Sequence, residues 1–365
     1  MNFAFMRTAS FRNLADAEVD VRGKDIFLVG ENGQGKTNFL EALYFCSYAS
    51  SFRGVRDRDL AKSGKKDFSA AVSFESSLYS DVAILFKDGK KNIVLDGKKI
   101  EDRKELLSVA SIIAFCHEDM EFIAGTPERR RWFFDQTRSL WDPLYLDDLR
   151  KYRHVLKTRN ALFRKDGSAR PRLTAEISAM LDALDPQLAH YGLELTRKRQ
   201  KTAEDFSLVF EPLYREISGI SGIGVQYIPS WKNDDREVIA AQLCQRRDAD
   251  MSLGVSLSGP HRDRYQFTRE GEDFSGNAST GQRRLLALLL RVAQSKVFSE
   301  KTGKKPVFLL DDVLLELDGE KRQRFLSVMP EYEQAFYTFL PGEYEKYRKP
   351  DTRVYRIDSG RVCLL

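Results

Sequence analysis

A glycine-rich segment near the N-terminus constrains this chain more than any other feature. It reads Gly30-Glu31-Asn32-Gly33-Gln34-Gly35-Lys36-Thr37, between the apolar run Asp25–Val29 and a stretch with helical spacing, Thr37–Phe45, whose apolar residues fall on one side. A strand, a glycine loop of this spacing and a helix form the phosphate-binding loop of nucleotide-binding α/β domains. The alternative, a glycine turn with a surface lysine, is disfavoured by the strand before it and the helix after it.

This spacing of residue types has a physical reason. Glycines let backbone N–H groups surround phosphate oxygens, and the start of the helix adds the positive end of its dipole. We therefore expect all eight residues from Gly30 to Thr37 to bind nucleotide. Lys36 would bridge the β- and γ-phosphates, and the Thr37 hydroxyl would be a ligand of Mg²⁺.

A second motif, Pro306-Val307-Phe308-Leu309-Leu310-Asp311-Asp312, ends an apolar run with two acids. This pattern is typical of a buried parallel strand that delivers carboxylates at its C-terminal edge. Asp311 would hold Mg²⁺ directly or through water, and Asp312 could act as general base on the attacking water. Taken alone, the segment could equally be a strand followed by an acidic turn.

The separation of the two motifs narrows the class of protein. Asp311 follows Lys36 by 275 positions, and no Asn-Lys-x-Asp guanine motif is present. Small GTPases and nucleoside kinases usually place the metal carboxylate much closer, so the separation favours an ABC-type ATPase head that binds ATP.

ABC-type heads carry a third motif just upstream of the acidic strand, and Ser279-Thr280-Gly281-Gln282 lies 32 positions before Asp311. Ser279, Gly281 and Gln282 would offer a hydroxyl and N–H groups to a γ-phosphate at the start of an apolar helix. The competing interpretation is an ordinary helix N-cap. An acidic turn, Leu315-Glu316-Leu317-Asp318, matches the loop that such heads use across their dimer interface.

The pattern along the chain predicts an α/β fold, an ABC-type ATPase head (P-loop NTPase) with an inserted α-helical lobe. We expect residues 1–117 plus 255–365 to form a discontinuous head and residues 118–254 to form the lobe. Short alternating segments with turns at Asp88-Gly89 and Asp96-Gly97 predict a β-meander. Within the lobe, 166–168 reads as a helical hairpin and Asp185-Pro186 as a helix boundary.

Composition excludes several other classes. Apolar residues make up 42% of the 365, enough for a packed core, and the net charge of +5 permits nucleic-acid binding without demanding it. The four cysteines form no C-x-x-C pair, so no zinc site is expected. The longest apolar run is far too short for a membrane span. We expect a soluble, cytoplasmic protein with no membrane partner.

The motifs together resemble those of the RecF family of bacterial recombination-repair ATPases, which is related to SMC-type heads. The resemblance spans nearly the whole chain, and its specific parts are the 259–263 block and the Ser-Thr-Gly-Gln form of the signature. Its residues are Phe11–Leu14, Gly30–Ala42, Ser51–Arg53, Gly125-x-Pro127-x-x-Arg130-Arg131-x-Phe133-x-Asp135, Leu257–Asp263, Ser279–Arg284 and Leu309–Asp318.

The resemblance implies an ATPase that forms an ATP-dependent homodimer, binds DNA without sequence specificity, and works with RecO and RecR to load RecA. Ser279 would then act in trans on the partner's nucleotide, and slow hydrolysis would be a conformational switch. Three positions depart from ABC and SMC heads. Asp312 stands where they have Glu, and Leu315 stands where a small residue is usual. No His follows the strand near residues 336–338, where the switch position is expected, and Thr338 is the candidate for it.

Two basic stretches bear on DNA binding. Nine bases lie between Arg150 and Arg172, and four more lie in Arg197-Lys198-Arg199-Gln200-Lys201. Their density suits contacts to the phosphate backbone, and a solvated helical face is the plain alternative. The rival function is an ABC-type head that acts only on a protein partner, and a metabolic P-loop kinase is a distant third.

Overall fold

The computed structural model describes residues 2–75, 78–163, 173–315 and 319–365. It contains two compact units, one made of Met1–Asp119 with Leu288–Leu365 and the other of Met120–Ala287. Compactness alone does not show independent folding, so the domain bounds expected from the sequence remain a prediction. The expected hairpin at 166–168 and most of the acidic turn, 316–318, lie outside the described residues.

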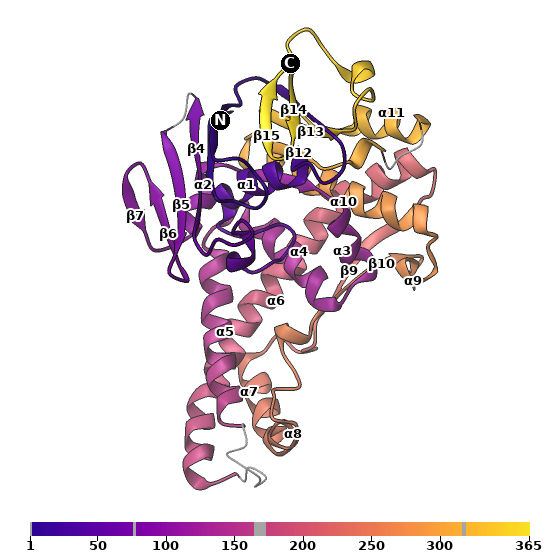
Figure 1. Cartoon of the computed structure of the whole chain (residues 1–365). Helices are drawn as coiled ribbons and strands as arrows, with labels where there is room; N and C mark the ends of the chain where they lie inside the picture. The colour runs from indigo at the N-terminus through magenta and orange to yellow at the C-terminus, as the bar shows by residue number, and fades with distance from the viewer. Residues whose placement is uncertain (1, 76–77, 164–172, 316–318) are drawn as a thin grey trace. The chain divides into compact units, whose positions relative to one another are not determined.

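The first unit contains a six-stranded, mostly parallel sheet in the order β15-β14-β3-β13-β12-β8 (Figure 1). Its parallel pairs are β8 with β12, β12 with β13, β13 with β3 and β3 with β14. The apolar runs predicted as buried strands are β3 and β12, and every residue of both is buried. The strands are β3 (Asp25–Val29), β8 (Ile112–Phe115), β12 (Val307–Leu310), β13 (Gln334–Phe339), β14 (Arg353–Asp358) and β15 (Arg361–Leu364).

A second, antiparallel sheet in this unit has the order β2-β1-β4-β5-β6-β7. The predicted meander is confirmed, and its turns at Asp88-Gly89 and Asp96-Gly97 have positive φ at both residues, as two-residue hairpins require. Its strands are β1 (Asn2–Ala9), β2 (Ala17–Asp20), β4 (Phe68–Glu75), β5 (Asp81–Lys87), β6 (Lys90–Leu95) and β7 (Lys98–Ile100).

Helix α1 (Lys36–Tyr48) packs against strands of both sheets. The helix expected over Thr37–Phe45 is present, and 11 of the 13 residues of α1 are buried, more than the apolar residues on one side alone. A helix enclosed on all sides needs no polar face, and Phe39, Leu40, Leu43 and Phe45 are inaccessible to solvent. The remaining helices of the unit are η1 (Asp57–Leu60), α2 (Lys104–Val109), η2 (His117–Met120, which ends at the unit boundary), η4 (Val313–Leu315), α11 (Gly319–Val328) and η5 (Glu345–Tyr347).

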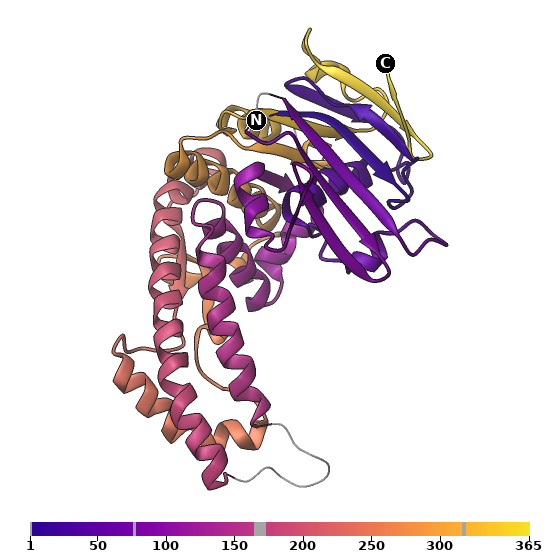
Figure 2. The ribbon, with the colours of Figure 1, turned by 90° about the vertical axis from the view of Figure 1, so that its left-hand side faces the viewer.

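The second unit is built on α5 (Tyr145–Ala161) and α6 (Ala175–Ser218), which run side by side in both views (Figure 1 and Figure 2). The unit also contains a three-stranded sheet in the order β11-β10-β9. The other elements are α3 (Glu121–Ala124), α4 (Pro127–Ser139), β9 (Ile223–Ile228), α7 (Arg236–Gln245), α8 (Arg247–Leu253), η3 (Pro260–Arg262), β10 (Arg264–Arg269), β11 (Glu272–Asp273) and α9 (Phe274–Asn277). Helix α10 (Thr280–Thr302) begins in this unit and ends in the first.

The helix boundary expected at Asp185-Pro186 is wrong, because α6 continues through Pro186 and through Pro212. A proline inside a helix removes one backbone hydrogen bond and costs about 3 kcal/mol. Packing of Leu181, Leu188 and Leu193 into the core of the unit offsets that cost. Among the described helices, none is both long and apolar enough to cross a bilayer.

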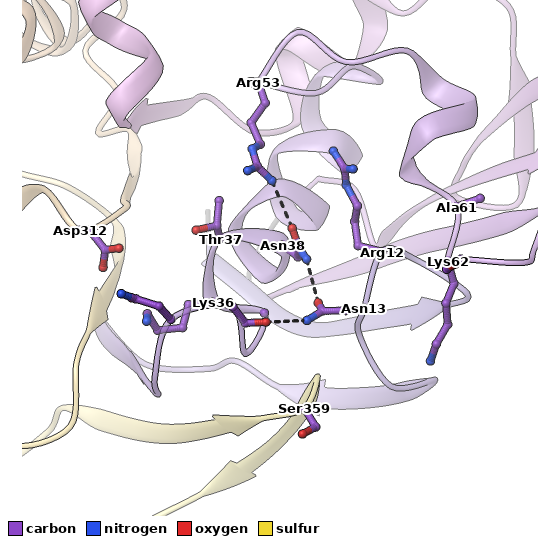
Figure 3. Close-up of a pocket in the computed structure, with 14 residues that line it drawn as sticks. Arg12, Asn13, Lys36, Thr37, Asn38, Arg53, Ala61, Lys62, Asp312 and Ser359 are labelled. Carbon is purple, nitrogen blue, oxygen red and sulfur yellow. Dashed lines mark hydrogen bonds between the residues drawn. The ribbon is translucent and has the colours of Figure 1, made fainter.

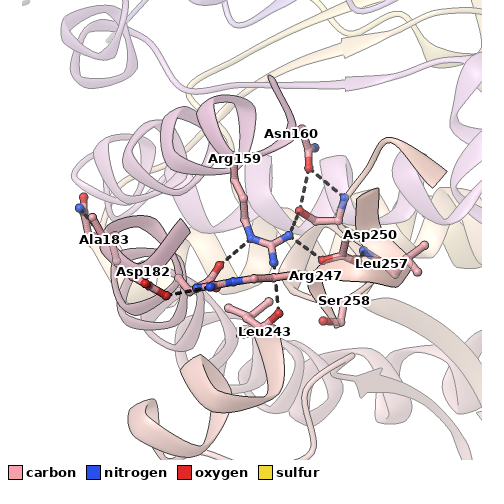
Figure 4. Close-up of polar contacts among 12 residues, drawn as sticks. Arg159, Asn160, Asp182, Ala183, Leu243, Arg247, Asp250, Leu257 and Ser258 are labelled. Atoms are coloured by element: carbon pink, nitrogen blue, oxygen red, sulfur yellow. Dashed lines mark hydrogen bonds and ion pairs between the residues drawn. The ribbon is translucent and has the colours of Figure 1, made fainter. Parts of the chain in front are cut away.

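A cluster of buried charged side chains joins helices of this unit (Figure 4). Arg159 of α5 is inaccessible to solvent and donates to Asp185 at 2.7 Å and to Asp250 at 2.6 Å. Arg247 shares Asp185, so two arginines and two aspartates from three helices, α5, α6 and α8, form one cluster. Removing one member of such a cluster leaves an unpaired buried charge.

We predict that Arg159→Ala lowers the free energy of unfolding by about 3–5 kcal/mol, because Asp250 loses its arginine inside the protein. Arg153→Ala on the same helix is the matched control, since Arg153 is exposed, and should change stability by under about 0.5 kcal/mol. Urea unfolding followed by circular dichroism measures both. Equal losses in the two variants would contradict the structural role of Arg159.

Candidate nucleotide-binding site

The glycine loop has the backbone that phosphate binding requires. Gly35 has a φ of 119°, and a Cβ there would lie 2.9 Å from Asn13 Oδ1, so no other residue fits without strain. Gly35 is also the N-cap of α1 and gives it no side-chain cap, and the first turn contains no acid. The N–H groups that open this 13-residue helix are therefore available to an anion.

Lys36 points back into the loop that precedes it. Its Nζ donates to the carbonyl of Gly30 at 2.7 Å and to that of Glu31 at 3.2 Å, and the side chain is buried. The loop is also held from outside, because Gln34 O accepts from the N–H of Gly360 and Gln34 Oε1 accepts from that of Ser359. The lysine charge thus lies in the concave part of the loop.

The acids at the end of β12 meet the loop directly. Thr37 Oγ1 donates to Asp311 Oδ1 at 2.9 Å, across a sequence separation of 274 residues. The structure therefore brings together the two motifs that the sequence assigned to one site. Asp312 follows with a φ of 53°, a left-handed conformation uncommon for a residue other than glycine.

Thr338 of β13 joins the two carboxylates. Its Oγ1 accepts the N–H of Asp312 at 2.7 Å, and its single proton lies within reach of Asp311 Oδ1 at 3.2 Å and Asp312 Oδ1 at 2.9 Å. The hydroxyl thus holds both the backbone and the side chain of Asp312. The position identified as a candidate switch contacts both acids of the site.

Burial and the charge of Asp312 raise the pKa of Asp311 to about 6, although hydrogen bonds from Thr37 and Thr338 act in the opposite direction. A carboxylate that is costly to ionise beside a hydroxyl and a second carboxylate fits a hard divalent cation, which accepts oxygen ligands. No three His, Cys, Asp or Glu side chains of the described residues gather into a complete metal cage.

A cavity of about 740 Å³ opens over the loop and includes Lys36, Thr37 and Asp312 in its lining (Figure 3). Its outer wall holds residues for which the sequence suggested no direct role. Arg53 donates to Asn38 Oδ1, Asn38 to Asn13 Oδ1, and Asn13 to the carbonyl of Gly33. This chain of hydrogen bonds connects an arginine at the cavity wall to the backbone of the phosphate loop.

Residues 11–14 and 51–53, noted only as family motifs, meet through a buried carboxylate on α1. Glu41 is inaccessible to solvent and accepts from Arg12 at 2.9 and 3.1 Å and from Ser51. Arg53 lies 3.9 Å from the same carboxylate. The place of Glu41 among apolar residues from Phe39 to Cys46 indicates that this acid is buried and needs a partner. Ser359 of the cavity wall gave no signal in the sequence.

The signature segment lies in the second unit, at the start of α10. Ser279 Oγ accepts from the N–H of Gln282, and Gln282 Oε1 accepts from the N–H of Ser279 at 2.8 Å. This reciprocal pair is a capping box. Ser279 and Gly281 are exposed and Gln282 is half-buried. The N-cap that the sequence offered as the plain alternative is present, and its hydroxyl keeps a proton to donate.

The dense basic stretches contain much internal pairing. Arg159 belongs to the buried cluster, and Arg199 is buried between Asp135 and Asp263. Lys198 pairs with Asp148, Arg197 with Glu194, and Lys201 with Asp205. Lys151, Arg153 and Lys157 are exposed, whereas Arg164, Lys165, Arg170 and Arg172 lie outside the described residues.

Two motifs of the resemblance converge on Arg199. Asp135, from the first motif, accepts from both Nε and Nη2 of this arginine at 2.9 Å, and Asp263, from the second, accepts from Nη1 at 3.1 Å. Arg130 and Arg131 donate to backbone carbonyls at Ile123 and Asp263. These residues stabilise the second unit, and none of them is in the lining of the nucleotide cavity.

Comparisons with known proteins show the family of this chain. Residues 5–342 match the model of the RecF/RecN/SMC N terminal domain family. The chain is 43% identical over 358 residues to the DNA replication and repair protein RecF of Treponema pallidum (strain Nichols), covering 97% of this chain and 99% of that protein. It is 32% identical over 361 residues to RecF of Clostridium acetobutylicum, with 97% of each covered.

Solved structures give the same result. The structure of the recombination mediator protein RecF-ATP in the RecFOR pathway superposes with a TM-score of 0.88 at 27% identity, covering 100% of this chain and 97% of that one. An Smc head bound to the C-winged helix domain of ScpA superposes at 0.56 and 16% identity, which shows a shared fold. The α/β ATPase head with helical content predicted from the sequence is thus confirmed, and the chain belongs to the RecF/RecN/SMC N-terminal domain family and, within it, to the RecF proteins.

Proposed function

We propose that this chain is an ATP-dependent DNA-binding protein of recombinational repair and replication-fork maintenance, in which slow ATP hydrolysis acts as a switch. The observation that carries the proposal is the contact between Thr37 and Asp311, which joins the phosphate loop to the acidic strand inside one cavity. The similar RecF-ATP structure supports ATP as the nucleotide.

In this proposal, one set of residues binds the phosphates and another holds the metal. The N–H groups at the start of α1 and the Lys36 ammonium bind the phosphates, and Lys36 exchanges its two carbonyl contacts for phosphate oxygens. Thr37 and Asp311 would hold Mg²⁺, which when bound neutralises charge on the β- and γ-phosphates. Arg12, Asn13 and Lys62 also line the cavity.

Asp312 is the general base in this proposal. It lines the nucleotide cavity, and Thr338 fixes its backbone N–H and its carboxylate. The carboxylate accepts a proton from the attacking water as the water forms its bond to the γ-phosphorus. The bond from that phosphorus to the β–γ bridging oxygen breaks, and ADP is the leaving group. The shorter side chain, where related heads have Glu, keeps the base close to the backbone and is consistent with slow turnover.

Ser279, Gly281 and Gln282 act in trans in this proposal, on ATP held by the other protomer of a homodimer. The support is chemical: the capping box leaves the Ser279 proton free, and the start of the 23-residue helix α10 attracts an anion. Such a two-fold pair would sandwich two nucleotides and clamp gapped or duplex DNA.

The partners proposed are DNA, RecO and RecR, with RecA loading as the outcome. The support is the family and the RecFOR pathway in which the similar structure is placed. The alternative is an ABC-type head that acts only on a protein partner. Absence of DNA binding at low salt, with ATP present, would favour that alternative.

We predict that Thr338→Val lowers kcat for ATP hydrolysis about tenfold to a hundredfold, because Asp312 loses the hydroxyl that orients it. The Kd for ATP should stay within about twofold, since Thr338 is absent from the cavity lining. Thr338→Ser should restore most of kcat, because serine retains the hydroxyl. Single-turnover hydrolysis and binding of a fluorescent ATP analogue measure the two quantities.

The control for this series is Thr302→Val, which removes a hydroxyl bonded to the carbonyl of Phe298 at the far end of α10. It should leave kcat unchanged. A Thr338→Ser variant as slow as Thr338→Val, or a Kd that rises in step with the loss of kcat, would show that Thr338 serves packing and not the base.

We predict that ATP with Mg²⁺ doubles the 41.9 kDa mass of the wild type in light scattering. Lys36→Ala should stay monomeric because it loses phosphate binding. Ser279→Ala should bind ATP and fail to double, because its contact lies across the interface. Thr174→Ala, which removes the cap of α6, costs similar helix stability and should still dimerise. Dimerisation of Ser279→Ala at the wild-type ATP concentration would remove Ser279 from the interface.

A further inference from the structure

A second cavity, of about 480 Å³, lies entirely within the second unit. Three bases line it, Lys232, Arg262 and Arg264, with Ile228, Leu257 and neighbouring backbone as its apolar part. They come from three separate places: the loop after β9, the short helix η3 and the first position of β10. No acidic side chain belongs to the lining.

These three charges differ from those of the dense basic stretches. All three side chains are exposed. No ion pair joins any of them to another residue in the part of the chain that the structure describes, and the one side-chain contact is from Arg262 to the carbonyl of Ser256 at 3.5 Å. Arg159, Lys198 and Arg199 by contrast each have a carboxylate partner within 3 Å. The cavity is therefore a place where positive charge is both gathered and available.

Hydrogen bonds to the buried Asp263 hold the backbone that carries two of these bases. Asp263 lies between Arg262 and Arg264, is buried, and accepts from Arg199, from Tyr227 and from the N–H of Ser230. Ser230 in turn accepts the N–H of Gly259. Since the charge of Asp263 is already met by Arg199 beneath the surface, it does not cancel the three bases that face the cavity.

The neighbouring His261 adds no charge to this cavity. Burial, together with the charges of Arg262 and Arg131, lowers the pKa of His261 to about 4, although its hydrogen bond to the Ser256 carbonyl acts in the opposite direction. His261 Nδ1 accepts from Tyr152 at 2.7 Å, because Nε2 carries the proton given to that carbonyl. The ring is thus neutral and structural, and leaves anion binding to the three bases.

We propose that this cavity binds the phosphodiester backbone of DNA, through Lys232, Arg262 and Arg264. The inference rests on the proposed function, because it assigns a site to the DNA binding given there. Arginine presents paired N–H donors to phosphate oxygens, and contacts to the phosphate backbone carry no sequence information. An acidic protein segment is the rival ligand, and the small apolar part of the lining gives it little to bury.

The test uses the full chain with ATP and Mg²⁺ and compares two triple variants of equal charge. One is Lys232→Gln, Arg262→Gln, Arg264→Gln; the control is Lys151→Gln, Arg153→Gln, Lys157→Gln on the exposed face of α5. Fluorescence anisotropy of a labelled duplex and of a labelled single strand, each over a range of salt, gives Kd and its salt dependence. Binding of an ATP analogue and the thermal midpoint should match the wild type in both variants.

We expect the cavity variant to weaken DNA binding at least about tenfold and to lower the slope of log K against log salt by about 2–3, one phosphate for each base. The control should stay within about twofold. Cavity and control variants that weaken binding equally would overturn the site, because the attraction would then be diffuse. A cavity variant that binds DNA as the wild type does would also overturn it.

Two further outcomes separate this inference from the proposed function. If the wild type itself fails to bind DNA at low salt, the proposed function fails first. If the wild type binds DNA normally and the cavity variant loses only binding to poly-glutamate of matched charge, the cavity serves an acidic protein segment and the proposed function stands.

Discussion

The position of β13 between β3 and β12 is the constraint on which the site depends. Parallel strands end at the same edge of a sheet, so β3 leads into the phosphate loop where β12 delivers Asp311 and Asp312. The strand between them supplies Thr338 at that edge. Thr37 and Asp311 are 274 residues apart, and they form a hydrogen bond of 2.9 Å because three short strands pair in this order.

The parts of this site that the sequence predicted are those with local chemistry. The motif from Gly30 to Thr37 is made of eight consecutive residues, so its chemistry is visible in the sequence itself. Asp311 follows an apolar run that is too short and too continuous to be a surface strand. Strand order is different, because an apolar run does not specify its neighbours. The contacts of Thr338, and the approach of Ser359 to Gln34, depend on that order and could not be predicted.

The stretches of sequence that are densest in basic residues are not where unpaired basic side chains gather, because several of their bases pair with acids. Arg159 stands four residues after Val155 and seven after Tyr152, both buried, so helical spacing places it on the apolar side of α5. Arg199 likewise stands four residues after the buried Leu195. A base in an apolar stripe must have a buried acid partner, and both have one. The exposed bases around the second cavity are scattered in sequence and meet only through the pairing of β9 with β10 and the turn before it.

The backbone around position 312 offers a physical explanation for the Asp that stands there where ABC and SMC heads have Glu. A shorter side chain has less freedom to search for the attacking water, so the backbone must place it, and here the backbone takes a left-handed conformation of φ 53°. Such a conformation persists only when its surroundings hold it. Thr338 does so with one hydroxyl that accepts the N–H of Asp312 and has a single proton for two carboxylates. If Asp312 is the base, as we propose, the reach of its carboxylate is set by how β12 and β13 pair. We then expect a small relative shift of these strands to change catalysis more than it changes nucleotide binding.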